Sequence, residues 1–258
     1  MSVELAVSLI SAVVALGSVV LTILLGARTA AGQMQLQAEI DQQRAAHAKQ
    51  EDRQELMNRL RDPVLWAAFD LQSRIYNIML QRFLLVYLVQ GSDEQRAYAQ
   101  RNTVFLFAQY LAWVEIVRRS VHFLDLGSKQ YNREVVNHFS KISGVLNSDG
   151  FPGLLFCIFR GDQRAIGEIM IDTSTGGDLT CIGYAEFCTR MDADSAFAQW
   201  FARLLTHIDQ LAAAVDQWHP RLVALQHNLV DLINLLDPES IRFPDRHRSK
   251  LQLDGLTD

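Results

Sequence analysis

The side chains best suited to chemistry are four charged residues in the segment FRGDQRAIGEIM, namely Arg160, Asp162, Arg164 and Glu168. Strongly apolar residues flank this segment, and a charge buried among apolar residues must pair or bind a ligand. Two arginines near a glycine suit an anion or nucleotide site, because guanidinium and free backbone N–H groups both donate hydrogen bonds to anionic oxygens. The alternative is an internal salt-bridge network that fixes the packing of the segment. Under both interpretations we expect Arg160 and Glu168 to be buried and hydrogen-bonded.

A second polar cluster lies on two predicted helices. Asp70, Arg74 and Asn77 recur at spacings of four and three residues, so they share one face of the first helix. Helices joined by a short loop pack side by side, and this face is therefore expected to meet Glu115 and Arg118 on the next helix. The cluster either belongs to the ligand site or forms a satisfied buried network, which sets packing specificity more often than chemistry.

Other chemical signatures are missing from the sequence. The seven histidines and three cysteines show no metal-ligand spacing, and no Walker A, GxGxxG or GxSxG motif occurs. We therefore expect no metal and no cofactor. We interpret the cysteines as small buried hydrophobic residues, with a nucleophilic cysteine activated by a histidine as the alternative. A net charge of −5, from 24 basic and 29 acidic residues, gives no support to nucleic acid as a partner. The sequence favours a binding protein over an enzyme.

An uninterrupted apolar stretch precedes all of these residues. Residues 5–25 read LAVSLISAVVALGSVVLTILL, with no charge, proline or amide. A helix of this length spans about 30 Å, the thickness of the hydrocarbon core of a bilayer. The alternative, a cleaved signal peptide, would carry a basic segment before the apolar stretch and a small-residue cleavage site after it, and neither is present. We predict a transmembrane anchor over residues 1–32.

The charges around the anchor indicate its orientation. Arg28, Arg44 and Lys49 follow the apolar stretch, and no basic residue precedes it. The positive-inside rule then places the N-terminus outside the inner membrane and the C-terminal domain in the cytoplasm. The odd number of cysteines agrees with a reducing compartment.

One face of the predicted anchor collects small and hydroxylated side chains. They recur at alternating spacings of three and four: Ser8, Ser11, Ala15, Ser18 and Thr22. Small residues allow transmembrane helices to approach closely, so this seam predicts self-association. The alternative is that each hydroxyl bonds only to its own helix.

The rest of the chain divides by composition. Residues 33–61 are rich in Gln, Ala, Glu and Arg and predict a polar helical stalk. Asp62–Pro63 suits the start of a helix, and residues 62–240 predict a helical domain, with helices to about 89, over 93–124, 129–146, 194–214 and 220–236. Residues 154–159 suit a buried strand or a helix piece, and 180–188 favour a strand. The tail, 241–258, is expected to be flexible.

The sequence thus predicts a mainly α fold: a single transmembrane helix, a polar helical stalk and a helical bundle with a small β insertion around 154–188. We expect a single-pass, membrane-anchored cytoplasmic protein that acts by self-association or partner binding in signalling, scaffolding or a defence or stress response. One alternative is a membrane-tethered enzyme or a sensor of an anionic ligand or nucleotide, and another is a small subunit of a larger membrane complex. The expected partners are the lipid bilayer, a second copy of the chain or another membrane protein, and a small anionic ligand.

Overall fold

The computed structural model describes residues 37, 39–48, 50–51, 59–121, 129–174, 177, 179–214 and 217–252. The chain forms two compact units, Met1–Asp52 and Arg53–Asp258. In the first unit, residues 39–48 are helical and almost entirely exposed. The predicted anchor and its seam lie outside the described residues. Within the ranges given above, no helix is both long enough and apolar enough to cross a membrane.

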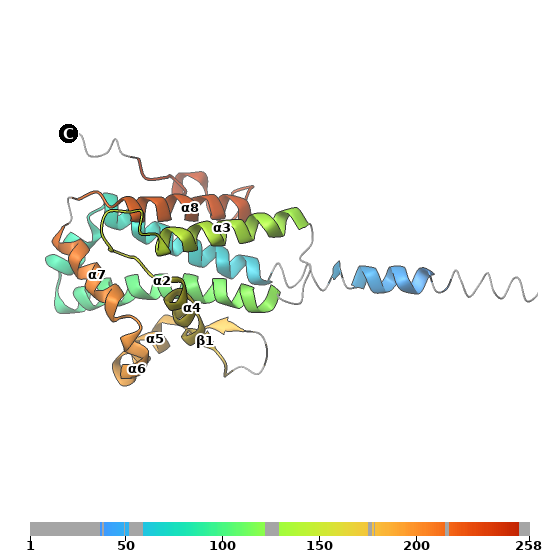
Figure 1. Cartoon of the computed structure of the whole chain (residues 1–258), viewed down its shortest axis with the longest axis horizontal. Coiled ribbons are helices and arrows are strands. Elements are labelled where there is room, and N and C mark those ends of the chain that lie inside the picture. The colour runs from blue at the N-terminus through green and yellow to red at the C-terminus, as the bar shows by residue number, and fades with distance from the viewer. Residues whose placement is uncertain are drawn as a thin grey trace, which may run out of the picture. The chain divides into compact units, whose positions relative to one another are not determined.

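The second unit is built mainly from helices (Figure 1), which confirms the predicted mainly α fold. It begins with a helix over residues 59–80. The elements that follow are η1 (Leu85–Val89), α2 (Asp93–Val121), α3 (Lys129–Asn147), α4 (Arg160–Ile169), β1 (Ile171–Asp172), β2 (Thr180–Cys181), α5 (Tyr184–Ala193), α6 (Ser195–Gln199), α7 (Ala202–Ala213), α8 (Pro220–Leu236) and η2 (Asp245–His247).

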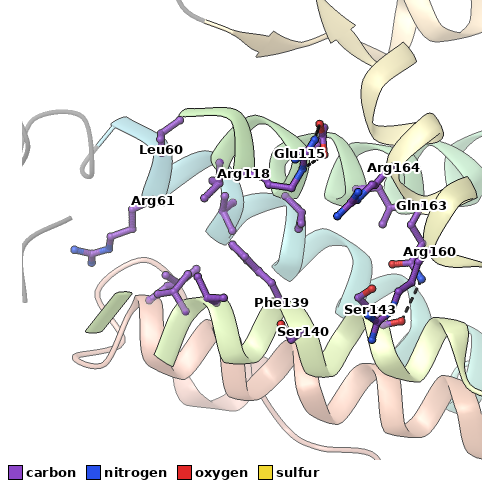
Figure 2. A pocket seen from close by; sticks show the side chains of 17 residues that line it. Leu60, Arg61, Glu115, Arg118, Phe139, Ser140, Ser143, Arg160, Gln163 and Arg164 are labelled. Carbon is purple, nitrogen blue, oxygen red and sulfur yellow. Dashed lines mark hydrogen bonds and ion pairs between the residues drawn. The ribbon is translucent and has the colours of Figure 1, made fainter. Parts of the chain in front are cut away.

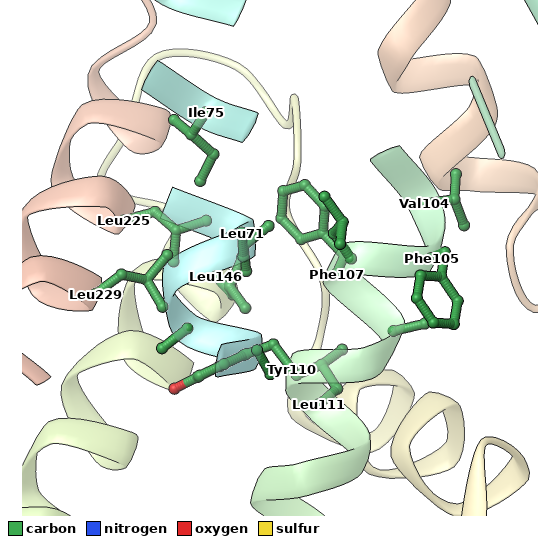
Figure 3. Close-up of a cluster of buried hydrophobic side chains, with 14 of the residues drawn as sticks. Leu71, Ile75, Val104, Phe105, Phe107, Tyr110, Leu111, Leu146, Leu225 and Leu229 are labelled. Carbon is green, nitrogen blue, oxygen red and sulfur yellow. The ribbon is translucent and has the colours of Figure 1, made fainter. Parts of the chain in front are cut away.

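The 59–80 helix is central because it is apolar on most of its circumference. Figure 3 shows Leu71 and Ile75 of this helix between Leu225 and Leu229 of α8 on one side and Phe107 of α2 on the other. All five side chains are buried. In Figure 1, α3 and α8 lie side by side and α2 runs along the opposite side of the central helix. A bundle of four long helices therefore carries the hydrophobic core.

Several helix ends differ from the sequence prediction. The 59–80 helix does not begin at Asp62–Pro63, since residues 59–61 are already helical. It also does not run on to residue 89: Arg82 takes a left-handed backbone conformation (φ 54°), and the π-helix η1 follows. Ser92 and Gln95 form a capping box at the start of α2. The Ser92 N–H donates to Gln95 Oε1 at 2.9 Å, and the Gln95 N–H donates to Ser92 Oγ at 3.3 Å.

The region around 154–188 contains very little β structure. β1 and β2 pair antiparallel, with Ile171 opposite Cys181. Residues 154–159 are neither strand nor helix, and Phe156 lies in the left-handed region (φ 55°). The strand expected over 180–188 ends at Cys181 because α5 begins at Tyr184. Phe187, in the first turn of α5, packs against Phe105 and Phe201. These residues are distant in sequence, so no local pattern predicts the contact.

The segment after α8 packs on the bundle. Residues 241–258 were expected to be flexible, but over 241–252 the chain is anchored: the Phe243 ring stacks on Phe69 with centroids 3.6 Å apart. Asp237 accepts hydrogen bonds from the N–H groups of Ile241, Arg242 and Phe243 and forms a buried ion pair with Arg248. Burial opposes the charge of Asp237, but these donors outweigh it and lower the pKa of the carboxyl.

We predict that Arg248→Met destabilises the protein by roughly 3–5 kcal/mol, because it leaves the Asp237 carboxylate buried without its cation. The side chains of Asp237 and Arg248 are only 1% and 5% exposed. Lys250→Met is the matched control, since Lys250 pairs with Asp231 at 2.6 Å on the surface and such pairs contribute about 1 kcal/mol or less. Urea unfolding followed by circular dichroism compares the two. Equal losses would contradict a structural role for the buried pair.

Candidate functional site

Helix α4 lies directly against α2, and a glycine makes this contact possible. A Cβ at Gly167 would stand 2.7 Å from the carbonyl oxygen of Leu111 and 2.9 Å from Cβ of Glu115. No larger residue fits at that separation. The buried face of α4 consists of Gln163, Ile166 and Gly167, at helical spacing.

The opposite face of α4 carries the four predicted site residues. Arg160, Arg164 and Glu168 are exposed, so the expectation that Arg160 and Glu168 are buried is wrong. The apolar residues just before Arg160 suggested burial, but they belong to an irregular segment and not to the helix. Because of the helical period of α4, its charged side chains lie on a different face of the helix from the side chains that contact the core.

The two acids of this group pair with other segments. Glu168 binds Arg119 of α2 at 3.1 Å, and Asp162 lies 3.8 Å from Arg203 of α7. The four charges therefore do not form a network among themselves. Their ion pairs instead connect α4 to its neighbours in the bundle.

Glu115 organises the charges of α2 near α4. Its side chain is 3% exposed and accepts hydrogen bonds from Arg118 Nε at 2.7 Å and Arg119 Nε at 2.8 Å. Burial alone would raise the pKa of Glu115, but the two arginines outweigh it and lower the pKa. Glu115 therefore stays ionised and holds Arg118 and Arg119 along α2.

The start of α4 is fixed to α3 by amide side chains. Asn147 Oδ1 accepts the backbone N–H of Arg160 at 3.1 Å. The Gln163 amide donates to the carbonyl oxygens of Ser143 and Ile158, at 3.1 and 2.8 Å. These positioning residues were missed in the sequence, although Asn147 opens its strongest turn signal (NSDGFPG).

The irregular segment before α4 is held by a histidine. His207 Nδ1 of α7 accepts the backbone N–H of Phe156 at 3.1 Å. Burial, with a smaller contribution from Arg203 and Arg221, lowers the pKa of His207. The neutral ring is the form that can accept this hydrogen bond, so the low pKa and the geometry agree.

A groove of about 440 Å³ opens between the 59–80 helix, α2, α3 and α4 (Figure 2). In Figure 2, Phe139 reaches into it from α3, and Arg160 and Arg164 stand near Ser143 at one end. Its walls are mostly apolar, and its charged lining residues are mostly basic. The residues that line it are Leu60, Arg61, Val64, Leu111, Val114, Glu115, Val117, Arg118, Val135, Val136, Phe139, Ser140, Ser143, Arg160, Gln163, Arg164 and Leu236.

The charges around the groove are unbalanced. Glu115 is the one acid among the described residues of the lining, and it accepts hydrogen bonds from Arg118 and Arg119. The guanidinium groups of Arg160 and Arg164 have no ion pair or hydrogen bond with any residue in the described ranges. The end of the groove at α4 therefore presents two positive charges beside an apolar cavity.

The second predicted cluster does not come together. Arg74 donates to Asn102 Oδ1 at 2.6 Å and to Thr103 Oγ1 at 3.2 Å, and its guanidinium lies 4.0 Å from the ring centroid of Phe83. Burial lowers the pKa of Arg74. Glu115 is 12 residues further along α2 than Thr103, or about 18 Å along the helix axis.

The remaining members of that cluster are also far from the groove. Asp70 is partly buried, and the pKa of its carboxyl is raised by burial, which Arg74 opposes only in part. Asn77 lines a separate polar pocket of about 340 Å³ beside the C-terminal segment, together with Gln72, Ser73, Tyr76, Gln81, Arg246, His247 and Ser249. Of the nine predicted site residues, the groove joins only Arg160, Arg164, Glu115 and Arg118.

Comparison with known proteins gives no relative for this arrangement. No protein-family model, no curated protein and no solved structure matches the chain. In the described part of the chain, no group of three His, Cys, Asp or Glu side chains is placed to hold a metal ion. Function must therefore be inferred from the groove and the side chains around it.

We predict opposite effects for two glycine substitutions in α4. Gly167→Ala should destabilise the protein by about 1–3 kcal/mol, because its Cβ collides with the backbone of α2. Gly161→Ala meets no atom within 4 Å and should stabilise the helix by about 0.5 kcal/mol. Thermal unfolding of the two variants measures both. If Gly167→Ala were as stable as Gly161→Ala, the close contact between α2 and α4 would not exist.

Proposed function

We propose that the protein is a membrane-tethered helical binding module, and that its groove takes a ligand with an apolar body and an anionic group. The supporting observation is the apolar groove that ends at Arg160 and Arg164, two cations without partners among the described residues. Ligand pockets are typically concave, mostly apolar and provided with a few convergent polar groups. Arginine pairs particularly well with carboxylate and phosphate groups.

The lining favours binding over catalysis. Among the described residues, Ser140 and Ser143 are the hydroxyl-bearing residues of the lining, and no histidine or cysteine lines the groove with them. Nucleophilic catalysis by serine needs an adjacent base. Glu115 is a poor base, because its low pKa and its two arginine partners keep it ionised and occupied.

The tether is the second part of the proposal. It is supported by the apolar stretch Leu5–Leu25, with the basic residues after it indicating a cytoplasmic domain. The small-residue seam of this stretch supports association with a second copy or with another membrane protein. In this proposal the groove senses a ligand near the inner membrane, and the tether brings copies of the protein together.

We predict that 4-phenylbutyrate, a soluble carboxylate with an apolar ring, raises the melting temperature of the full chain in a nonionic detergent. At ten times its Kd it would stabilise the fold by about 1.4 kcal/mol, or roughly 3–6 °C for a domain of this size. Arg160→Gln with Arg164→Gln should remove the shift without changing the stability of the unliganded protein, because both side chains are exposed.

The matched control is Arg96→Gln, which removes a surface arginine on α2 that binds Asp93 at 3.3 Å, far from the groove. This variant should keep the full shift. The uncharged 4-phenylbutanamide should give no shift. A shift that is the same in the double variant, or the same for the amide, would contradict an anion site at Arg160 and Arg164.

For the tether, we predict that the full chain stays in membranes after carbonate extraction and forms cross-linked oligomers. Replacing Ser11, Ala15 and Ser18 by Leu keeps the stretch apolar but prevents close approach, so retention should persist while cross-linking falls. Hydroxyl contacts between membrane helices contribute about 0.6–2 kcal/mol each. Release by carbonate would refute the tether, and unchanged cross-linking in the triple variant would refute the seam.

A further inference from the structure

We infer that the ligand of the groove is a fatty acid, whose acyl chain lies between α2 and α3 and whose carboxylate binds Arg160 and Arg164. This inference rests on the proposed function and narrows it, since an anion site could also serve a compact aromatic or nucleotide ligand. It is carried by the shape of the groove, the nature of its walls and the position of its charges.

The groove is elongated. On α2 its lining runs from Leu111 to Arg118, and on α3 it runs from Val135 to Ser143. At 1.5 Å per residue these stretches are about 10 and 12 Å long. Val114 and Val117 face the groove from α2, as Val135, Val136 and Phe139 do from α3. Two apolar stripes on neighbouring helices therefore form a trough for a linear apolar chain.

The two arginines of α4 lie at one end of this trough, and Arg61 lies at the other end, beside Leu60. Figure 2 shows Arg160 and Arg164 near Ser143, with Phe139 in the middle and Leu60 at the far end. The two arginines are four residues apart on α4 and therefore share one face of the helix. Their guanidinium groups can bind one carboxylate while the chain extends toward Leu60.

A polypeptide fits this groove less well than an acyl chain. Each peptide unit brings an N–H and a C=O group, and burying either without a partner is costly. The walls of the groove are helices, whose backbone groups already bond within the helix, and the wall side chains between the two ends are mostly Val, Leu and Phe. An acyl chain carries no polar group along its length and needs none.

The volume of the groove limits the number of acyl chains that it can hold. A groove of about 440 Å³ lies toward the lower end of the range for drug-sized ligands, which favours one chain over the two of a membrane phospholipid. A fatty acid is also available where the proposed tether would place the domain, because it partitions into the bilayer.

The test uses the full chain in its native membranes and a palmitic acid that carries a photoreactive diazirine and an alkyne. After irradiation, labelled peptides are identified by mass spectrometry. The proposed anchor (5–25) meets lipid in any case and serves as the internal standard. We expect labelling of the α2 and α3 stretches that line the groove, at a level that free palmitic acid reduces by competition and hexadecanol does not.

Three variants make the test specific. Arg160→Gln with Arg164→Gln should lower groove labelling at least tenfold relative to the anchor, since a hydrogen bond to a charged group is worth about a factor of ten or more in affinity. Ser140→Trp fills the groove from an exposed position of α3 and should abolish groove labelling. Arg96→Gln should leave it unchanged. Melting curves verify that each variant is folded.

The outcomes separate this inference from the proposed function. If 4-phenylbutyrate stabilises the protein through Arg160 and Arg164 but the groove is not labelled by the lipid, the anion site stands and the fatty acid is wrong. If hexadecanol competes as well as palmitic acid, the carboxylate contact is wrong. Labelling that survives Ser140→Trp would show that the chain lies elsewhere and would overturn the inference. If phenylbutyrate has no effect and the groove is unlabelled, both proposals fail.

Discussion

The contact between Gly167 and the backbone of Leu111 determines where the charged residues of α4 stand. Because no side chain separates α4 from α2 there, the two helices approach as closely as their backbones allow. This approach brings Glu168 to Arg119 and seats Gln163 between α4 and α3. With α4 fixed in this way, its outer face can only present Arg160 and Arg164 along the edge of the groove.

Near the contact between α2 and α4, some arginines in the described part of the chain are paired with acids and others are not. Glu115, buried beneath α4, binds Arg118 and Arg119, and Glu168 reinforces the second of these. Two of the four arginines near this junction are therefore neutralised within the fold. Arg160 and Arg164 have no ion-pair partner among the described residues. The structural network and the proposed anion site, which looked like alternatives in the sequence, occupy adjacent positions on the same pair of helices.

Sequence reasoning recovered what depends on local pattern. The helical period located α3 and α8 to within a residue. It failed where contacts between segments that are distant in sequence determine the structure. The burial of Arg160 was inferred from its apolar neighbours, but the helix begins at that residue and turns it outward. The groove could not be predicted, because its walls come from four segments that are distant in sequence, and the approach of two of them, α2 and α4, depends on Gly167.

The segment after α8 packs on the 59–80 helix, and this contact bears on how the domain folds during synthesis. Gln72 donates to the carbonyl oxygen of His247, 175 residues away, and Arg242 binds Asp62 across 180 residues. The 59–80 helix enters the ribosomal exit tunnel first among the core helices, yet its cover is completed only by residues that follow it by 175 to 180 positions. Contacts of such long sequence separation slow folding, and domains generally fold as units during synthesis. Part of the surface of the 59–80 helix therefore stays uncovered until the segment around residues 242–247 has been synthesised, and apolar surface exposed in this way is what chaperones bind.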